Sequence, residues 1–378
     1  MTASSAFPSP LPSPSADGAA APAPAGAPRR APNAHLSDFT ALSARIKSAG
    51  LLQRAYGHYW RRLIGLPLIG AALVVAFLLI GDSWWQMLIA AAFALLMTQV
   101  AFLGHDAAHR QIFASARWNE WVSLLVVNLG AGMGLGWWNG KHSKHHGSPN
   151  TVGTDPDIAP GVLVFAPGDA QARRTRLGRW LTARQGLFFF PLLLLEGVNL
   201  HVQGISRLLS KRPIKRRAVE LTFIAVRLVA FFALIFLVLS PGKALAFAAV
   251  ELGVFGLCMG LAFAPNHIGM PILPKGVKVD FLRRQVLMSR NISGGRMVDV
   301  LMGGLNLQIE HHLFPSMARP NLRRAAPIVR EYCRSLGVAY HETPLGRSYR
   351  EVAEYINQAG RGGLDVWACP LSQQLGRG

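Results

Sequence analysis

The chain of 378 residues is too apolar for an ordinary soluble protein, because 51% of its residues are hydrophobic and only 15% are charged. Lysine and arginine outnumber aspartate and glutamate by 39 to 19, and these charges lie between and around apolar runs. This pattern favours an anionic membrane surface and argues against nucleic acid as a partner. The three cysteines form no CxxC pair, so neither a disulfide framework nor a cysteine-ligated cluster is expected.

The N-terminal residues 1–34 are rich in proline, alanine and serine. Such a segment cannot bury a core, so we expect it to be disordered. It also has no apolar central region of the kind that a secretory signal peptide requires. A helical pattern follows it and leads into the first long apolar run.

Four apolar runs are predicted to cross a membrane as two helical hairpins. Residues 63–80 and 84–104 are uncharged and joined by the short link "GDS", and residues 218–240 and 244–264 are joined by "PGK". At 1.5 Å per residue, each run is about long enough for a bilayer core of roughly 30 Å.

Two charged residues lie within the predicted spans, and two further apolar stretches contain polar residues or glycine. Arg227 and Glu251 lie in the second hairpin, where a charge is costly, so we expect Arg227 to extend toward the interface and Glu251 to face protein or a cavity. A purely structural pairing of the two is the alternative. The apolar stretches 118–138 and 187–202 contain glycine or polar residues, and we interpret them as interfacial or re-entrant helices.

The loops predict the orientation of the chain. The turns 81–83 and 241–243 hold one lysine between them, whereas segments 105–217 and 265–378 carry many arginines and lysines. By the positive-inside rule, both termini and both large segments are cytoplasmic.

Histidines gather in the predicted cytoplasmic segments, in the motifs "HDAAH", "HSKHH" and "QIEHH". Spacings of three and four residues place these side chains on one face of a helix. Imidazole suits iron, zinc, copper and nickel, and seven imidazoles exceed the needs of one ion, so we predict two metal ions. The seven candidate ligands are His105, His109, His142, His145, His146, His311 and His312.

Further candidates surround these motifs. His267 follows the fourth apolar run directly and is an eighth candidate ligand. Gln308 occupies the position that His142 has in "HSKHH", and its amide could ligate a metal, hold a water or bond to a ligand. The alternative for Gln308 is a space-filling role. Four carboxylates could orient the imidazoles or lie on the surface, namely Asp106, Asp155, Asp157 and Glu310.

Oxidative chemistry on a lipid is the reaction that this arrangement favours. Zinc also binds imidazole, but cleavage of an unactivated methylene C–H bond requires a metal that activates O2. Iron can do so and redox-inert zinc cannot. Isolated histidines are expected to be structural, as for His201, or solvated, as for His35, His58 and His341.

The segments "GHDAAHRQIF", "GKHSKHHGSPNTVGTDPDI" and "GGLNLQIEHHLFP" resemble the three histidine boxes of the membrane fatty-acid desaturase family. The likeness runs from about residue 37 to 340, and "QIEHH" is similar to the front-end, or Δ6-like, branch and to actinobacterial-type acyl desaturases. It implies a helical membrane domain with a cytosolic cap, two histidine-bound irons and a narrow acyl tunnel. The seven clustered histidines match the box ligands, and His267 matches an additional histidine after the last span.

The resemblance also implies a reaction and its partners. A cis double bond would form in a fatty-acyl chain, with O2 as co-substrate and water as product. The chain contains no HPGG haem motif, so we expect a separate donor of ferredoxin or cytochrome b5 type with an NAD(P)H reductase. A hydroxylase or ketolase of the same superfamily is the first alternative, and a non-enzymatic metal-binding membrane protein is a distant one.

The expected fold is therefore an all-α integral membrane protein with two transmembrane hairpins, interfacial helices and a cytoplasmic helical cap that holds the metal site. Within it, residues 35–345 are expected to form the desaturase domain. Residues 346–378 are expected to form a C-terminal cytoplasmic tail.

Overall fold

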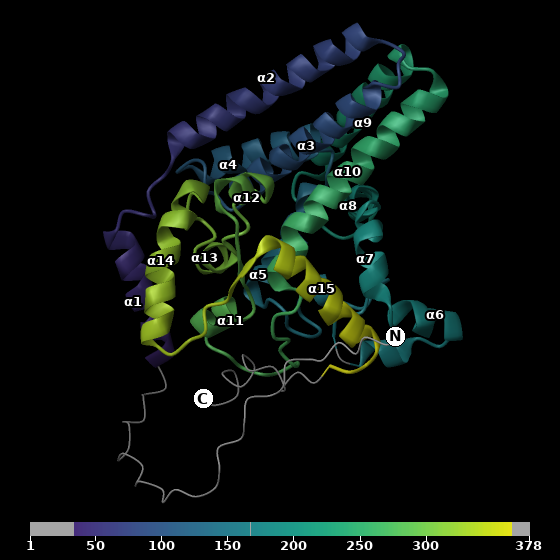
Figure 1. Cartoon of the computed structure of the whole chain (residues 1–378). Helices are drawn as coiled ribbons and strands as arrows, with labels where there is room; N and C mark the ends of the chain where they lie inside the picture. The colour runs from purple at the N-terminus through teal and green to yellow at the C-terminus, as the bar shows by residue number, and fades with distance from the viewer. Residues whose placement is uncertain (1–33, 167, 365–378) are drawn as a thin grey trace, which may run out of the picture. The chain divides into compact units, whose positions relative to one another are not determined.

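The computed structural model describes residues 34–166 and 168–364, which are mainly helical (Figure 1). The predicted disordered segment therefore lies outside the described residues, apart from Ala34. The helices α1 to α15 span, in order, Ala34–Ser48, Tyr56–Ile80, Gln86–Ala108, Ala116–Ser123, Leu135–Gly147, Arg176–Thr182, Gln185–Leu193, Glu196–Leu209, Arg217–Val238, Pro241–His267, Phe281–Leu287, Gly295–Leu301, Gln308–Leu313, Arg319–Ser335 and Leu345–Gly360. The shorter elements are the π-helix η1 (Leu124–Gly130), the 3-10 helices η2 (Pro156–Ile158) and η3 (Asp169–Ala172), and the parallel strands β1 (Asn291–Ser293) and β2 (Glu342–Pro344).

Four helices, α2, α3, α9 and α10, are long and apolar enough to cross a membrane, which confirms the four predicted spans. Helix α3 packs against both α2 and α10, and α9 precedes α10 in the chain as its hairpin partner (Figure 1). The helices extend beyond the apolar runs because helical hydrogen bonding continues into polar sequence. Helix α10 reaches His267 in this way, and α3 carries His105 within its last turn.

Two further apolar stretches form sharply bent helix pairs. The segment that runs through α4 and η1 meets α5 at 115°, and α7 meets α8 at 72°. Each pair is either a broken span or a re-entrant loop, which gives four spans or as many as six. The bends suit a close crossing of α5 and α8, because a Cβ atom on Gly134 would lie only 2.8 Å from the Cα of Gly204.

The C-terminal half packs around a second core. Helices α1, α11, α13 and α14 bury a cluster that includes Leu42, Val286, Ile309 and Val329. Helix α15 packs against α7, where Val352 joins a small apolar cluster. Helix α15 begins at Leu345, the last residue of the predicted desaturase domain. The first part of the predicted tail therefore forms a helix that packs against the rest of the protein. Residues 365–378 of the predicted tail lie outside the described residues.

Candidate metal centre

All eight candidate histidines come from four helix ends that meet in space. Helix α3 and its C-cap supply His105 and His109, α5 supplies the "HSKHH" histidines, α10 ends at His267, and α13 supplies His311 and His312. Rings from different helices lie in contact, since the ring centroids of His105 and His311 are 4.7 Å apart. The spacing of three and four residues keeps the histidines of each motif toward one side of its helix, and the helix crossings bring the motifs together.

One set of four side chains, here called the first imidazole group, consists of His105, His109, His142 and His311. Each offers a ring nitrogen, and these nitrogens all lie within 4.8 Å of one another. The closest pair is His109 Nε2 and His142 Nε2, at 2.8 Å. His146 adjoins this group, because its Nε2 lies 3.1 Å from the Nε2 atoms of both His142 and His311.

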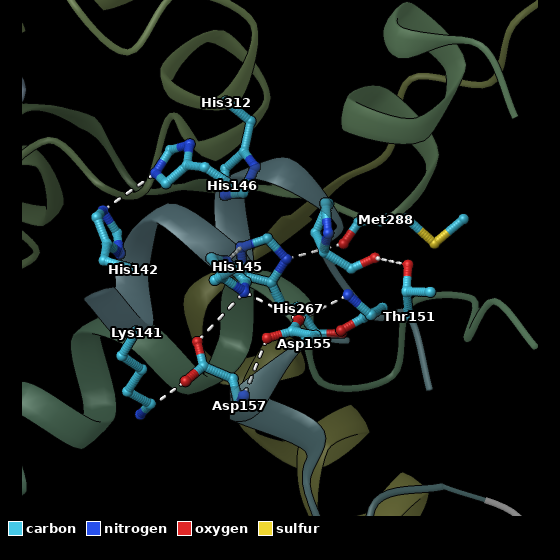
Figure 2. Close-up of polar contacts among 12 residues, drawn as sticks. Lys141, His142, His145, His146, Thr151, Asp155, Asp157, His267, Met288 and His312 are labelled. Carbon is cyan, nitrogen blue, oxygen red and sulfur yellow. Dashed lines mark hydrogen bonds and ion pairs between the residues drawn. The ribbon is translucent and has the colours of Figure 1, made fainter. Parts of the chain in front are cut away.

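A second imidazole group consists of His145, His267 and His312, again with ring nitrogens within 4.8 Å of one another. His145 Nε2 and His267 Nε2 are 3.2 Å apart, and the two rings lie perpendicular to each other (Figure 2). The amide of Gln308 joins this group, because its Nε2 lies 2.9 Å from His267 Nε2. Gln308 is buried, so its amide faces the histidines and not solvent.

These distances fit metal coordination. Two imidazole nitrogens that bind one ion at about 2.1 Å in adjacent positions lie roughly 3.0–3.4 Å apart, for angles between about 90° and the tetrahedral value. Among the described residues, His105 Nε2 in the first group and His312 Nε2 in the second are buried and have no hydrogen-bond partner. Burial and the neighbouring imidazoles hold the pKa of His311 and His312 well below the usual value, which favours the neutral form of both rings. Neutral imidazole is the form that binds a metal, and the two groups could hold metal ions.

A carboxylate orients His145 from the side away from the second group. Asp155 Oδ2 lies 3.0 Å from His145 Nδ1, and Asp157 Oδ2 lies 3.2 Å from it, as Figure 2 shows. Burial alone would lower the pKa of His145, but the Asp155 hydrogen bond and the charge of Asp157 outweigh it and raise that pKa. A carboxylate can only accept, so Nδ1 donates and Nε2 faces the second group. Lys141 neutralises Asp157 at 2.7 Å.

The other two histidines of the second group are oriented by residues that sequence analysis missed. His267 Nδ1 lies 2.9 Å from the carbonyl oxygen of Met288, and His312 Nδ1 lies 2.8 Å from Gln285 Oε1. Both acceptors lie in or just after helix α11, which contains no histidine. No motif spacing marks them, because Gln285 reaches His312 through the packing of α11 against α13, and the Met288 carbonyl reaches His267 at the end of α10.

A buried ion pair supports the first group. Asp106 Oδ1 lies 3.5 Å from His105 Nδ1, and Asp106 Oδ2 lies 2.6 Å from the guanidinium of Arg319. Arg319 also donates a 2.7 Å hydrogen bond to the carbonyl oxygen of Phe102. The side chains of His105, Asp106 and Arg319 are buried, so this ion pair connects helix α14 to the first histidine motif. On the other side of this group, the ring of Trp138 stacks on His142 with centroids 4.3 Å apart.

Glu310 makes contacts of a different kind. Its carboxylate accepts hydrogen bonds from Asn291 Nδ2 at 2.7 Å and from the Tyr340 hydroxyl at 2.8 Å. Burial raises its pKa to about 7. Asn291 also accepts from the backbone N–H of Ile309 at 3.0 Å, so this network joins α13 to β1.

The isolated histidines lie elsewhere. His201 Nδ1 is 2.7 Å from the carbonyl oxygen of Gly197, and its Nε2 is 3.2 Å from that of Ala131, which agrees with a structural role. His58 and His341 are partly buried and not fully solvated. The side chain of His35 is outside the described part of the chain.

Four helices apolar enough to cross a membrane, with buried or partly buried imidazoles that could hold metal ions at the helix ends, define an integral membrane protein with a candidate metal centre. The model of the fatty acid desaturase family matches residues 82–344, and the chain belongs to this family. The predicted family, enzyme class and helical membrane fold are thereby confirmed.

Curated relatives agree with this assignment. A Delta(8)-fatty-acid desaturase of Helianthus annuus is 29% identical over 317 residues, covering 80% of this chain and 69% of the relative. An acyl-lipid (9-3)-desaturase of Borago officinalis is 30% identical, covering 67% of this chain and 59% of the relative. Fatty acid desaturase 3 of Bos taurus is 30% identical, covering 88% and 75%. The chain is thus similar to desaturases of the front-end type.

Proposed function

We propose that this protein is a di-iron fatty-acyl desaturase whose metal centre faces the cytoplasm. The observation that carries the proposal is the pair of buried or partly buried imidazole groups, each with ring nitrogens within 4.8 Å of one another. Two irons bound there would activate O2, so that two hydrogens leave adjacent methylene carbons and, with two electrons and two protons, a double bond and two waters form. The proposed ligands are His105, His109, His142, His145, His146, His267, His311 and His312, with Gln308 as a weak ligand or hydrogen-bond partner.

The role of the surrounding side chains is to fix the ligands before any metal binds. Asp155, Gln285 and the Met288 carbonyl each hold an Nδ1 atom, so that the opposite Nε2 atoms face the second group. Asp106 and Arg319 support the first group in the same way from α3 and α14. Such outer contacts set both ring orientation and ligand basicity.

The proposed substrate is a fatty-acyl chain that the enzyme meets in the membrane. The four apolar spans keep the metal centre close to lipid, and the relatives are named as desaturases of fatty-acyl chains. From these names we expect this protein to place the double bond with the position selectivity of front-end desaturases. A hydroxylated product would instead favour the alternative reaction.

The proposed electron donor is a separate acidic protein of ferredoxin or cytochrome b5 type. Lysine and arginine outnumber acidic residues by 39 to 19 and are concentrated in the segments that the positive-inside rule assigns to the cytoplasm. A basic surface raises the association rate of an acidic partner, and salt screens that attraction.

Metal analysis of the purified protein tests the proposal. We expect two irons per chain in the wild type, and a clear loss of iron in His145→Ala and His311→Ala. His341→Ala is the matched control, because this histidine lies outside both imidazole groups and should leave the iron content unchanged. Zinc in place of iron, or full iron content in both ligand variants, would overturn the proposal.

A further inference from the structure

Two adjoining cavities lie among the apolar helices. The larger, of about 230 Å³, is bordered by α2, α3, α9 and α10, and the smaller, of about 190 Å³, by α8, α9 and α10 together with Met97 and Ala131. Met97, Arg227 and Phe231 border both cavities. The remaining lining is apolar except for Glu251 and His201, which border the smaller one.

The depth of this polar site sets it apart from the metal centre. Glu251 is ten residues from the start of α10, which corresponds to about 15 Å and hence to the middle of a bilayer core of roughly 30 Å. His267, at the other end of the same helix, is sixteen residues away, or about 24 Å. The cavities therefore form a site separate from the imidazole groups.

Two opposite charges border the smaller cavity without forming an ion pair. Glu251 is only 5% exposed, and nothing in the described part of the chain gives its carboxylate a hydrogen bond or a salt bridge. Arg227 donates from Nε to the carbonyl oxygen of Gly130 at 3.2 Å, and its guanidinium lies 4.9 Å from the ring centroid of Phe231. His201 is already engaged by two backbone carbonyls. One further contact of Arg227 is weak, because its Nη2 lies 4.0 Å from the Met97 sulfur. The Glu251 carboxylate and the remaining guanidinium N–H groups can thus bind a ligand.

The chemistry of these two groups selects the ligand. A carboxylate accepts hydrogen bonds and a guanidinium donates them, so one hydroxyl group can satisfy both. An unsubstituted alkyl chain can satisfy neither, and an ether or a carbonyl can satisfy only the arginine. A buried charge that lacks a partner is costly in a low-dielectric site, so the hydroxyl should add considerably to affinity.

We propose that the two cavities bind a long alkyl or acyl chain that carries a hydroxyl group in its interior. The hydroxyl lies between Arg227 and Glu251, and one arm of the chain extends into each cavity. Entry is lateral from the bilayer, since Val198, Val202 and Phe232 line the smaller cavity and are 44%, 53% and 42% exposed. This site is independent of the proposed function, because it contains none of the metal ligands.

Binding to metal-free protein in detergent tests the proposal without any activity measurement. The probes are a secondary octadecanol with its hydroxyl at mid-chain, the methyl ether of that alcohol, and octadecane. We expect the alcohol to bind at least about tenfold more tightly than the ether, because a hydrogen bond to a charged group is lost in the ether. Equal affinities of wild-type protein for alcohol and ether would overturn the proposal, whether or not any variant folds.

Two variants at one position then locate the site. Glu251→Leu should abolish the preference for the alcohol, whereas Glu251→Gln should retain most of it, because the amide oxygen still accepts a hydrogen bond. A preference that survives unchanged in folded Glu251→Leu would place the hydroxyl elsewhere and contradict the proposal. Loss of iron from the centre would not alter either result, so failure here and failure of the proposed function are distinguishable.

Discussion

Asp155 offers a direct way to measure what an outer contact contributes to metal binding. Its Oδ2 faces both His145 Nδ1, at 3.0 Å, and the backbone N–H of Asn150, at 2.7 Å, while its Oδ1 accepts from the N–H of Asp157 at 2.9 Å. The side chain is only 1% exposed. In Asp155→Asn one of the two oxygens becomes an NH2 group, so at least one buried donor then faces another donor.

The expected loss follows from that mismatch. A buried donor without an acceptor costs about 1–3 kcal/mol, and loss of an outer partner of a metal ligand typically lowers metal affinity about 10- to 100-fold. We therefore expect iron affinity in Asp155→Asn to fall by about 10- to 100-fold, because His145 Nδ1 then faces either an NH2 group or an uncharged amide oxygen in place of a carboxylate. The assay is iron retention during titration of loaded, purified protein with a competing chelator.

A second substitution, at Asp157, shows how much of the loss in iron affinity is specific to Asp155. Asp157→Asn should cost less, because Asp157 is 40% exposed and is already neutralised by Lys141. Wild-type iron retention in Asp155→Asn would refute the claim that this carboxylate fixes the ligand. An equal loss in both variants would show that charge, and not the geometry of the hydrogen bond, sets the affinity.

Three further predictions follow from other parts of the structure. Arg319→Met leaves Asp106 as an unpaired buried charge and should lower the unfolding free energy by about 3–5 kcal/mol, measured by thermal unfolding of metal-free protein. The double variant with Asp106→Asn should recover part of that loss. An unchanged melting temperature in Arg319→Met would contradict the ion pair. Gln308→Leu should lower iron content and activity, and Gln308→His should also perturb activity; near-normal values in Gln308→Leu would mean that the amide only fills space. Reporters placed in residues 241–243 should be outside and reporters after residue 378 cytoplasmic, and reversed signals would refute the topology.

The sequence predicts the helices and the ligand motifs because both depend on local spacing. Histidines at i, i+3 and i+4 lie on one helical face, and apolar runs of about 20 residues span a bilayer, so neither requires knowledge of the tertiary fold. Asp155 could also be anticipated as a partner, since it follows "HSKHH" by only nine residues. Local pattern was thus sufficient wherever the interacting residues lie on one helix or in the adjacent loop.

Contacts between distant helices could not be predicted in this way. Gln285 meets His312 because α11 packs beside α13, and the Met288 carbonyl meets His267 at the end of α10. Arg319 meets Asp106 across more than 200 positions of sequence. Glu310 directly precedes the candidate ligand His311, yet its neighbours in sequence give no hint of its bonds to Asn291 and Tyr340. Such contacts depend on helix crossings, which no single-sequence periodicity encodes.

The central claim is best tested by the product of the reaction. Fatty acids of a host that expresses the wild-type protein together with a suitable electron donor should be profiled by mass spectrometry beside those of a host that expresses His311→Ala. We predict new acyl chains that are two hydrogens lighter and contain a cis double bond, and their absence from the His311→Ala host. Acyl chains that instead gain an oxygen atom, or identical profiles for the two hosts with both proteins present in the membrane, would contradict the account.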